Sequence, residues 1–528
     1  MNDALRNTYD ELPYESHAFP QTHPDRLSVI ARLFGMQPAP LEGCRVLELG
    51  CGNGANIIAM AALMPDATFL GVDLSPRQIE VGQARIAELG LTNVELRAAD
   101  LLEIENDLPV FDFIIAHGLY SWVPPNVQQA VLRICSRHLS PQGIAYVSYN
   151  TFPGWRMRGT IRDFMLYHVR QFEGPALQTQ QARALLDFMA QSAPGENTPF
   201  TLQLKNEVEE IRKQPDAYLF HDFLEPFNQP VYFFRFVEAV DAHGLQYLGE
   251  AELATMLPSN FSPATAETLN RIAPDLVRTE QFMDFLRNRQ FRQTLLVHRD
   301  VKLSRQIDAR VIEKLEVASQ AQPANVPVDE RSDAKVEFKL PNGFSLTTAT
   351  PITKAAFALM ALRWPRSAPF AELRDAARAR LGALPTAVPD PAVVAKDTQT
   401  LALELMQCAA ANMVELRTRP ARFSIQAGER PVAWSVARQE ARTGPHVSNL
   451  RHETITLDEF NRQILLRLDG TRDRAALIEE LSTLVASNEL AIQQEGVEVR
   501  DPSTVRAIMT QAVDNSLVTL ARAGLYPE

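Results

Sequence analysis

The stretch RVLELGCGNG, residues 45–54, decides the fold of this chain. An apolar run ends here in glycines spaced G-x-G-x-G, at Gly50, Gly52 and Gly54, and residues of helical spacing follow near 54–64. A strand that ends in a glycine-rich turn and opens a helix is typical of a nucleotide-binding βαβ unit. Glycine lets the backbone turn tightly and approach a ligand that a Cβ atom would exclude. We therefore expect a nucleotide site at this turn.

The residues that follow repeat the alternation of strand and helix. Apolar runs at 68–74, 94–100, 111–118 and 143–150 predict further strands, and stretches near 76–90 and 126–138 have helical spacing. Strands that alternate with helices form parallel sheets with helices on both faces. We predict an α/β fold, a doubly wound Rossmann-like core domain within residues 1–150.

The remainder of the chain is predicted to add insertions and smaller units. We expect a helical insertion at 151–220, a region at 221–300 that completes the sheet with strands at 245–251 and 293–298 around a second insertion, and a helix with a polar linker at 301–335. Two weakly similar segments follow, 352–381 and 457–485, each with a further helix and a short apolar tail, 412–417 and 516–521. They predict two α+β winged-helix-like domains, 336–425 and 426–528.

Composition excludes several classes of protein. The 528 residues carry a net charge of −12, which disfavours a nucleic-acid backbone as the main partner. The start MNDALRNTYDEL lacks the features of a signal peptide, and no apolar run approaches the roughly 18 residues that span a bilayer. The few, scattered cysteines fit a reducing compartment, and no residues have metal-ligand spacing. We expect a cytoplasmic protein without membrane insertion or a bound metal.

Acidic residues at the predicted strand ends indicate which nucleotide binds. Glu48 precedes the glycines, Asp73 ends the second strand and Asp100 the third. Asp73 is expected to accept both ribose hydroxyls and Asp100 the adenine amino group, with Leu74 and Leu101 beside them. S-adenosylmethionine has no phosphate but carries an amino group and a sulfonium, so it suits Glu48 and the G-x-G-x-G spacing. The series matches class I methyltransferases; the alternative is an NAD-type or decayed Rossmann domain.

Aromatic loops follow the fourth and fifth predicted strands, HGLYSWVP at 117–124 and YNTFPGW at 149–155. Both loops should face the crevice that holds the glycine turn. Aromatic faces attract a sulfonium or a lysine ammonium, which makes these loops the candidate reacting centre. Packing is the alternative for the two tryptophans. The candidate catalytic residues are Tyr120, Trp122, Tyr149, Asn150 and Trp155. No [DN]PP[YF] motif follows the fourth strand, which counts against methylation of DNA adenine or glutamine.

Two smaller clusters allow two interpretations each. Residues 221–225, HDFLE, could bring carboxylates to the crevice, or Asp222 could cap a helix N-terminus. Tyr14, with Pro13 and His17, could fold over the cofactor as a lid, or these residues could form a plain surface arm.

Several segments resemble bacterial methyltransferases that carry a methyltransferase regulatory domain, among them the rickettsial lysine methyltransferases of outer-membrane proteins. The segments are 9–27, 117–124, 148–155, 221–236 and 285–298. The resemblance implies a class I core interrupted by a dimerisation segment, with middle and C-terminal domains around an open cavity. It also implies S-adenosylmethionine as cofactor, His117 beside its sulfonium end, a homodimer, and methylation of lysine side chains in a protein such as an outer-membrane or surface protein.

Two other functions remain open from the sequence. A small-molecule O- or N-methyltransferase would use the helical insertions to close a compact pocket. A regulator would sense the cofactor and bind DNA or a partner through its helix-turn-helix-like units, a reading that depends on the arginine clusters 374–380 and 467–474. The alternative for these clusters is an ordinary solvated helix face.

Overall fold

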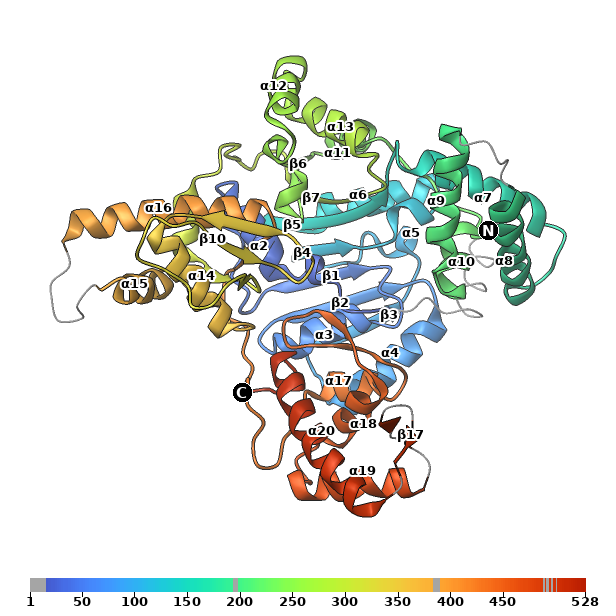
Figure 1. Cartoon of the computed structure of the whole chain (residues 1–528). Helices are drawn as coiled ribbons and strands as arrows, with labels where there is room; N and C mark the ends of the chain where they lie inside the picture. The colour runs from blue at the N-terminus through green and yellow to red at the C-terminus, as the bar shows by residue number, and fades with distance from the viewer. Residues whose placement is uncertain are drawn as a thin grey trace. The chain divides into compact units, whose positions relative to one another are not determined.

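The computed structural model describes residues 16–192, 198–382, 390–487, 490, 493–494, 497–499 and 501–528. They belong to two compact units, which are described separately (Figure 1). Residues 27–307 form nearly all of the first unit, and residues 17–26 and 308–528 form the second. The division after Ile307 lies earlier in the chain than the polar stretch 319–335 that we expected to be a linker.

The first unit is built on one seven-stranded sheet in the order β3-β2-β1-β4-β5-β7-β6. Its strands are β1 Arg45–Leu49, β2 Thr68–Asp73, β3 Val94–Ala98, β4 Phe111–Ala116, β5 Leu139–Asn150, β6 Leu245–Glu250 and β7 Phe291–His298. Strands β1 to β5 are parallel, whereas β7 runs antiparallel to both β5 and β6. The predicted Rossmann-like sheet, with its late completion, is confirmed. The direction of β7 is new, because an apolar pattern carries no information on strand direction.

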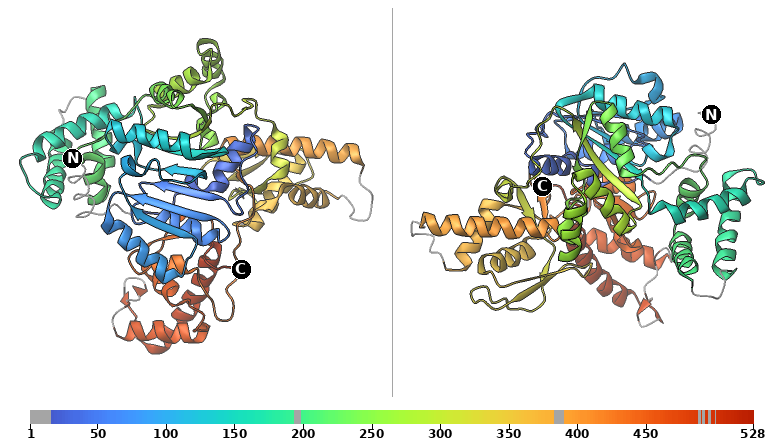
Figure 2. Two further views of the ribbon diagram at one scale, coloured as in Figure 1. Left: turned by 180° about the vertical axis from the view of Figure 1, so that it is seen from behind. Right: turned by 90° about the horizontal axis from the view of Figure 1, so that it is seen from above.

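Helices connect the strands as predicted, and they cover the faces of the sheet. They are α2 Pro24–Leu33, of which residues 27–33 belong to this unit, α3 Ala55–Leu63, α4 Pro76–Leu89, α5 Leu101–Ile104, α6 Pro125–His138 and α11 Phe233–Ala242. On one face, α6 and α11 bury Val131 and Phe236 against Ile114 of β4 and Leu296 of β7. The left view of Figure 2 shows the strands of the sheet side by side. The order of the strands along the chain reverses between β1 and β4. Open α/β sheets bind ligands at this kind of reversal, which is called a topological switch point.

The insertion after β5 consists of four helices with a core of their own. They are α7 Trp155–Val169, α8 Pro175–Ser192, α9 Pro199–Arg212 and α10 Asp216–Phe223. Ile161, Met165, Leu186 and Leu219 are fully buried among them. Because α10 begins at Asp216, Asp222 lies in its last turn. The interpretation of Asp222 as a helix N-cap was therefore wrong; burial instead raises the pKa of Asp222 to about 6.

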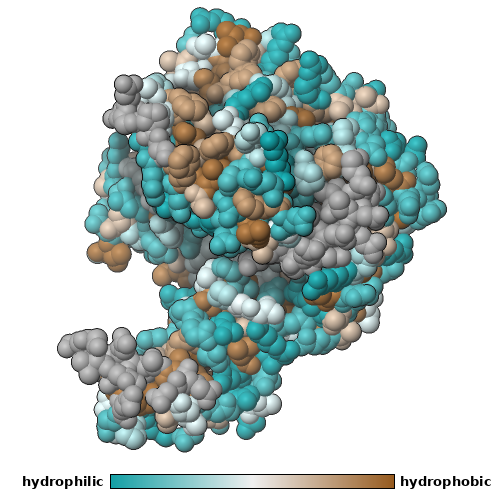
Figure 3. All heavy atoms as spheres, turned by 90° about the vertical axis from the view of Figure 1, so that its right-hand side faces the viewer, coloured by the Kyte–Doolittle hydropathy of each residue, from teal (hydrophilic) through white to brown (hydrophobic). Residues whose placement is uncertain are grey.

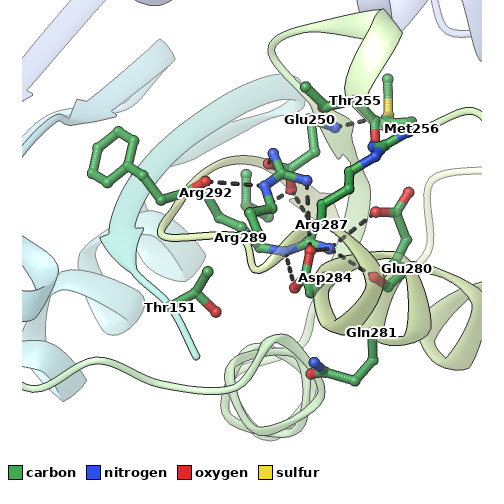
Figure 4. A network of polar contacts seen from close by, with 12 residues as sticks. Thr151, Glu250, Thr255, Met256, Glu280, Gln281, Asp284, Arg287, Arg289 and Arg292 are labelled. Carbon is green, nitrogen blue, oxygen red and sulfur yellow. Dashed lines mark hydrogen bonds and ion pairs between the residues drawn. The ribbon is translucent and has the colours of Figure 1, made fainter. Parts of the chain in front are cut away.

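A second insertion, between β6 and β7, is fastened to the sheet by buried charges. It holds the short 3-10 turns η3 Leu253–Thr255 and η4 Pro258–Asn260 and the helices α12 Pro263–Ile272 and α13 Leu276–Arg287. Arg292 of β7, which is 0% exposed, donates to Asp284 at 2.8 and 2.9 Å, to Glu250 at 2.8 Å and to Glu280 at 3.0 Å (Figure 4). Its guanidinium also lies 3.7 Å from the Phe233 ring centroid. One arginine thus joins α13 to both added strands.

The second unit contains the expected duplication of helical segments. Its first half holds η5 Ala309–Lys314, β8 Glu316–Ala318, β9 Gln322–Pro323, β10 Val336–Lys339, β11 Ser345–Thr348, α14 Pro351–Arg363, β12 Ala368–Pro369, α15 Phe370–Arg380, α16 Pro391–Ala410 and β13 Glu415–Arg417. The stretch 319–335 is part of this fold: Ser319 is buried and donates to the Met413 carbonyl, and Ala321 is buried beside it. Its polar composition reflects hydrogen-bonded turns and not a free linker.

The second half of this unit is also composed of helices and short strands. It holds α17 Ser435–Glu440, β14 His446–Ser448, β15 Thr454–Thr456, α18 Glu459–Arg467, α19 Arg474–Ala486, β16 Gln493–Gln494, β17 Val497–Glu498 and α20 Pro502–Arg522. The apolar tail 516–521 was expected to form a strand, as 412–417 does in part with β13, and this expectation was wrong. It forms the last turns of α20, because Leu517, Leu520 and Ala521 recur at helical spacing on a buried face.

The buried network around Arg292 gives a prediction on stability. Arg292→Met removes the guanidinium that three buried carboxylates share and leaves only Arg289, 2.8 Å from Glu250 and 3.8 Å from Asp284, so the first unit should lose about 3–5 kcal/mol of unfolding free energy. Hydrogen exchange of the β6 and β7 amides, read by mass spectrometry, measures the change. The control is Arg235→Met, which removes one partner of the exposed pair Arg235–Glu238 and should change nothing measurable. Equal exchange in the two variants would contradict the role of the network.

Candidate functional site

The glycine turn after β1 has the backbone conformation that the sequence predicted. Gly50, Gly52 and Gly54 have φ values of +71°, +54° and +75°, a region that side chains disfavour. A Cβ atom on Gly54 would lie 2.8 Å from Leu96, whereas one on Gly52 would meet nothing within 4 Å. Gly54 is therefore needed for close packing, and the backbone at Gly52 borders open space.

Asp73 ties the end of β2 to this turn. Its carboxylate accepts the Gly52 N–H at 2.8 Å and the Ser75 N–H at 2.9 Å. These two bonds hold the carboxylate in a fixed orientation beside the glycine turn. Leu74, the next residue, is half-buried beside it.

Glu48 is a buried acid with an unsatisfied oxygen. Its Oε1 accepts from the Asn56 amide at 2.7 Å, and its Oε2, although buried, has no hydrogen-bond partner among the described residues. Burial, with a smaller contribution from Asp73, raises the pKa of Glu48 to about 8. A buried acceptor without a donor costs about 1–3 kcal/mol, so this oxygen fits a cationic donor on a ligand.

Asp100 and Leu101 lie where β3 ends. Asp100 caps α5 by accepting the Leu102 N–H at 2.9 Å, and its side chain is half-buried. Leu101 is 8% exposed and belongs to the hydrophobic core. Three acidic side chains, Glu48, Asp73 and Asp100, therefore end three neighbouring strands of one sheet edge.

His117 follows β4 and is held by the neighbouring strand. Its Nδ1 lies 3.0 Å from the Tyr146 hydroxyl and 3.3 Å from Ser148 Oγ, and Ser148 also accepts the Gly118 N–H at 2.8 Å. Burial lowers the pKa of His117 to about 4, so the ring is neutral at pH 7. The sequence reasoning missed Tyr146 and Ser148. Their alternation with Tyr149 on β5 was the pattern that could have revealed them.

Tyr120 and Tyr149, two of the candidate catalytic residues, lie in the core. They are 3% and 1% exposed and pack against Phe236, on which Tyr149 stacks at 4.1 Å. The Tyr149 hydroxyl lies 3.1 Å from Thr294 Oγ1. Tyr149 points to the face of β5 opposite Ser148, so the structure does not bring either tyrosine to His117.

The tryptophans meet as the loop sequences suggested, but their environments differ. Trp122 and Trp155 are edge to face with ring centroids 6.2 Å apart. Trp155 is 3% exposed and packs on Phe223, 6.1 Å away, which is a packing role. Trp122 is only half-buried and remains the aromatic candidate at the reacting centre.

Asn150 joins three chain segments at the end of β5. Its backbone N–H donates to Ser121 Oγ at 2.8 Å, and its side chain donates to Asn228 Oδ1 at 3.1 Å. The Asn228 amide nitrogen is buried without a hydrogen-bond partner among the described residues. Asn228 is a site residue that the sequence reasoning missed, although it lies within the resembling segment 221–236.

The structure describes part of the two clusters that had open interpretations. His221 Nδ1 lies 3.1 Å from Glu225 Oε1 in a buried pair next to the insertion. His17 belongs to the second unit, where its ring is 5.6 Å from that of His446. Tyr14 and Pro13 lie outside the described residues.

The arginine clusters of the second unit are neutralised. Each of the six arginines forms an ion pair: Arg374–Asp375, Arg378–Asp397, Arg380–Glu330, Arg467–Glu480, Arg472–Asp469 and Arg474–Asp514. This favours an ordinary helix surface over a nucleic-acid interface. Within the described ranges, no group of three or more histidine, cysteine, aspartate or glutamate side chains is arranged to hold a metal ion, and no helix is long and apolar enough to cross a membrane.

Comparison with known proteins agrees with this geometry. A methyltransferase domain matches residues 46–143, a methyltransferase regulatory domain matches 215–298, and a PKMT C-terminal winged-helix domain matches 429–525. An uncharacterized protein of Rickettsia prowazekii is 35% identical over 512 residues, which are 95% of this chain and 90% of that protein.

Similarity to solved structures also extends over the whole chain. The structure of PKMT2 from Rickettsia typhi has a TM-score of 0.87 at 30% identity, covering 97% of this chain and 100% of that one. A second structure, PKMT2 in complex with AdoHcy, has a TM-score of 0.86. With the glycine turn and the acidic strand ends in place, the chain belongs to the family of class I S-adenosylmethionine-dependent methyltransferases that carry a methyltransferase regulatory domain and a PKMT winged-helix domain.

Proposed function

We propose that this methyltransferase transfers methyl groups to lysine side chains of a protein substrate. The observation that carries the proposal is the similarity to PKMT2, which includes the C-terminal domain as well as the catalytic core. An outer-membrane or other surface protein is the substrate class that the family resemblance indicates. The proposal includes a cytoplasmic location, since the four cysteines are free and buried.

The acidic strand ends are proposed to hold the cofactor. Asp73 accepts the ribose hydroxyls and Asp100 the adenine amino group. The orphaned oxygen of Glu48 accepts from the amino group of the methionine moiety, and its burial makes that ion pair strong. His117 lies at the sulfonium end, where a neutral ring does not repel the positive charge. Bound S-adenosylmethionine supplies a methyl group on a sulfonium that a nucleophile displaces in line.

The aromatic and amide side chains after β4 and β5 are proposed to position the lysine. The face of Trp122 attracts the ammonium as it enters, by about 0.5–2 kcal/mol. Removal of the ammonium from water, in contrast, disfavours the charged form, which lowers the lysine pKa and makes the nitrogen lone pair available. The Asn150–Asn228 pair offers a polar contact at the same strand ends. Alignment and exclusion of water then do most of the catalytic work.

A homodimer is a further part of the proposal. The insertion formed by α7, α8 and α9, which the resemblance implies to be a dimerisation segment, exposes large apolar side chains. They include Tyr167 at 66%, Phe188 at 56% and Phe200 at 56%. Figure 3 views the side of the molecule that carries the insertion and shows brown apolar groups among teal polar ones. Burying these side chains against a second copy would remove apolar area from water.

The proposed function is tested by methyl transfer to an extract of cells that lack the gene. Purified protein and methyl-tritiated S-adenosylmethionine are added, and the labelled proteins are hydrolysed. Label in methylated lysine is the expected result. Label in small molecules alone would instead support the small-molecule methyltransferase, and no transfer at all would favour a cofactor-sensing regulator.

Trp122→Ala should lower kcat on the labelled protein substrate by about 10- to 100-fold, because the acceptor nitrogen loses its positioning surface. Trp122→Phe, which keeps an aromatic face, should retain most of the rate. Calorimetry should find the affinity for S-adenosylhomocysteine unchanged in both variants. An unaltered kcat in Trp122→Ala would make Trp122 a packing residue.

Binding of S-adenosylhomocysteine should release about one proton at pH 7. With a pKa of about 8, the Glu48 carboxyl is mostly protonated before binding and must ionise to pair with the ligand ammonium. Affinity should therefore rise as the pH approaches 8 from below. Calorimetry in buffers of different ionisation enthalpy counts the proton. Glu48→Gln should abolish the release, and an unchanged count would remove Glu48 from the amino-group site.

Sedimentation velocity should find the wild-type chain as a dimer. Combined Phe188→Asp and Phe200→Asp substitutions place charges on the proposed interface and should yield monomers. Phe344→Asp, at a residue 66% exposed in the second unit, is the matched control and should leave the dimer intact. A wild-type monomer at micromolar concentration would refute the dimer.

A further inference from the structure

An arginine at the start of α7 is held rigidly at the surface. The Arg156 guanidinium lies 4.1 Å from the Phe152 ring centroid and 5.8 Å from that of Tyr232. Its Nη2 donates to the Tyr232 hydroxyl at 3.1 Å. Tyr232 is itself supported, because it stacks on Phe234 at 5.7 Å and contacts Phe285 at 5.8 Å. The guanidinium is therefore fixed by aromatic rings although Arg156 is exposed.

Arg156 has no carboxylate partner. Of the described residues, none with a carboxylate lies within ion-pair distance of it, whereas Arg158, two positions later, pairs with Glu207 at 3.2 Å. An exposed arginine normally loses side-chain entropy when it binds a ligand, and the rings have already restricted this one. The planar guanidinium matches a carboxylate in a two-point hydrogen bond. The aromatic rings thus hold the Arg156 guanidinium in place before any ligand binds, and among the described residues no acidic side chain pairs with it. An acidic group of another molecule could therefore bind there.

The position of Arg156 relative to the sheet indicates which molecule that is. Helix α7 starts directly beyond the end of β5, and Trp155, the preceding residue, contacts Trp122 after β4. In the strand order, β5 lies on the far side of β4 from β1, β2 and β3, which carry the glycine turn and the acidic residues proposed for the cofactor. Arg156 therefore follows the strand end that is nearest to the proposed acceptor residues, and not the strand ends proposed for the cofactor.

We propose that Arg156 determines substrate specificity by binding an aspartate or glutamate that lies near the acceptor lysine in the substrate chain. The inference rests on the proposed function, protein-lysine methylation, and adds the chemistry of the segment that is recognised. The net charge of −12 does not oppose it. Charges beyond about 8 Å are screened at physiological salt, so the local cation decides the contact.

The test maps methylation sites in the extract of cells that lack the gene. Each purified full-length variant receives the same extract with S-adenosylmethionine carrying a deuterated methyl group, and mass spectrometry locates and quantifies the labelled lysines. For the wild type, aspartate and glutamate should be enriched beside labelled lysines relative to unlabelled ones. Arg156→Gln should lower labelling of these acidic sites about 10-fold or more, as expected for a lost charged hydrogen bond. Arg156→Glu should shift labelling toward sites with basic neighbours.

Arg170→Gln is the matched control. Arg170 ends the same helix and lies over the ring of Tyr167 at 4.2 Å, but it is far from the end of β5. This variant should keep the wild-type pattern, and calorimetry should find the affinity for S-adenosylhomocysteine unchanged in all variants.

Several results would overturn the inference and leave protein-lysine methylation standing. They are wild-type sites without acidic enrichment, equal loss in Arg156→Gln and Arg170→Gln, and loss of cofactor-product affinity in Arg156→Gln. A wild-type reaction with no labelled lysine in any protein would instead refute the proposed function, and the inference with it.

Discussion

The parallel pairing of β1 with β2 on one side and β4 on the other is the constraint on which the site depends. Glu48 is in register with Gly71 of β2 and with Ile115 of β4, so the residues that follow these strands meet at one edge. The Asp73 carboxylate then fastens the glycine turn to the end of β2 through the Gly52 N–H. The strand pairing thus brings together a turn, an acid and a histidine from distant parts of the sequence, and side-chain hydrogen bonds of Asp73, Tyr146 and Ser148 fix them there.

Strand β5 shows how one element can serve the core and the site at once. Tyr149 lies on the face that packs against Phe236, whereas Tyr146 and Ser148 lie on the other face and hold His117. The antiparallel partner β7 secures β5 from the outer side, and Arg292 of β7 is anchored by the acids of β6 and α13. The added strands therefore support the acceptor side of the crevice, next to which α7 places Arg156.

Each half of the proposed crevice contains a buried polar atom without a hydrogen-bond partner among the described residues. On the cofactor side, Glu48 has an oxygen without a partner, and on the acceptor side the Asn228 amide nitrogen lacks one. Around Arg292 most charged atoms are paired within the protein, although Glu280 Oε1 is buried without a hydrogen-bond partner among the described residues, and the arginine clusters of the second unit form ion pairs. The unpaired atoms of Glu48 and Asn228 differ from Glu280 Oε1 in lying beside the strand ends where ligands are proposed to bind.

The sequence by itself determined the strands of the sheet, the glycine turn and the acidic strand ends, because each depends on local spacing and on the rule that parallel strand ends share an edge. Only the tertiary structure decided that Tyr120, Tyr149 and Trp155 are buried, that Tyr146 and Ser148 contact His117 and Asn228 contacts Asn150, and that residues 516–521 are helical. Which face of a strand a side chain occupies, and which partner neutralises a charge, depend on residues far away in the chain. Arg156 illustrates this, since its identity as an arginine was in the sequence but its lack of a carboxylate partner was not.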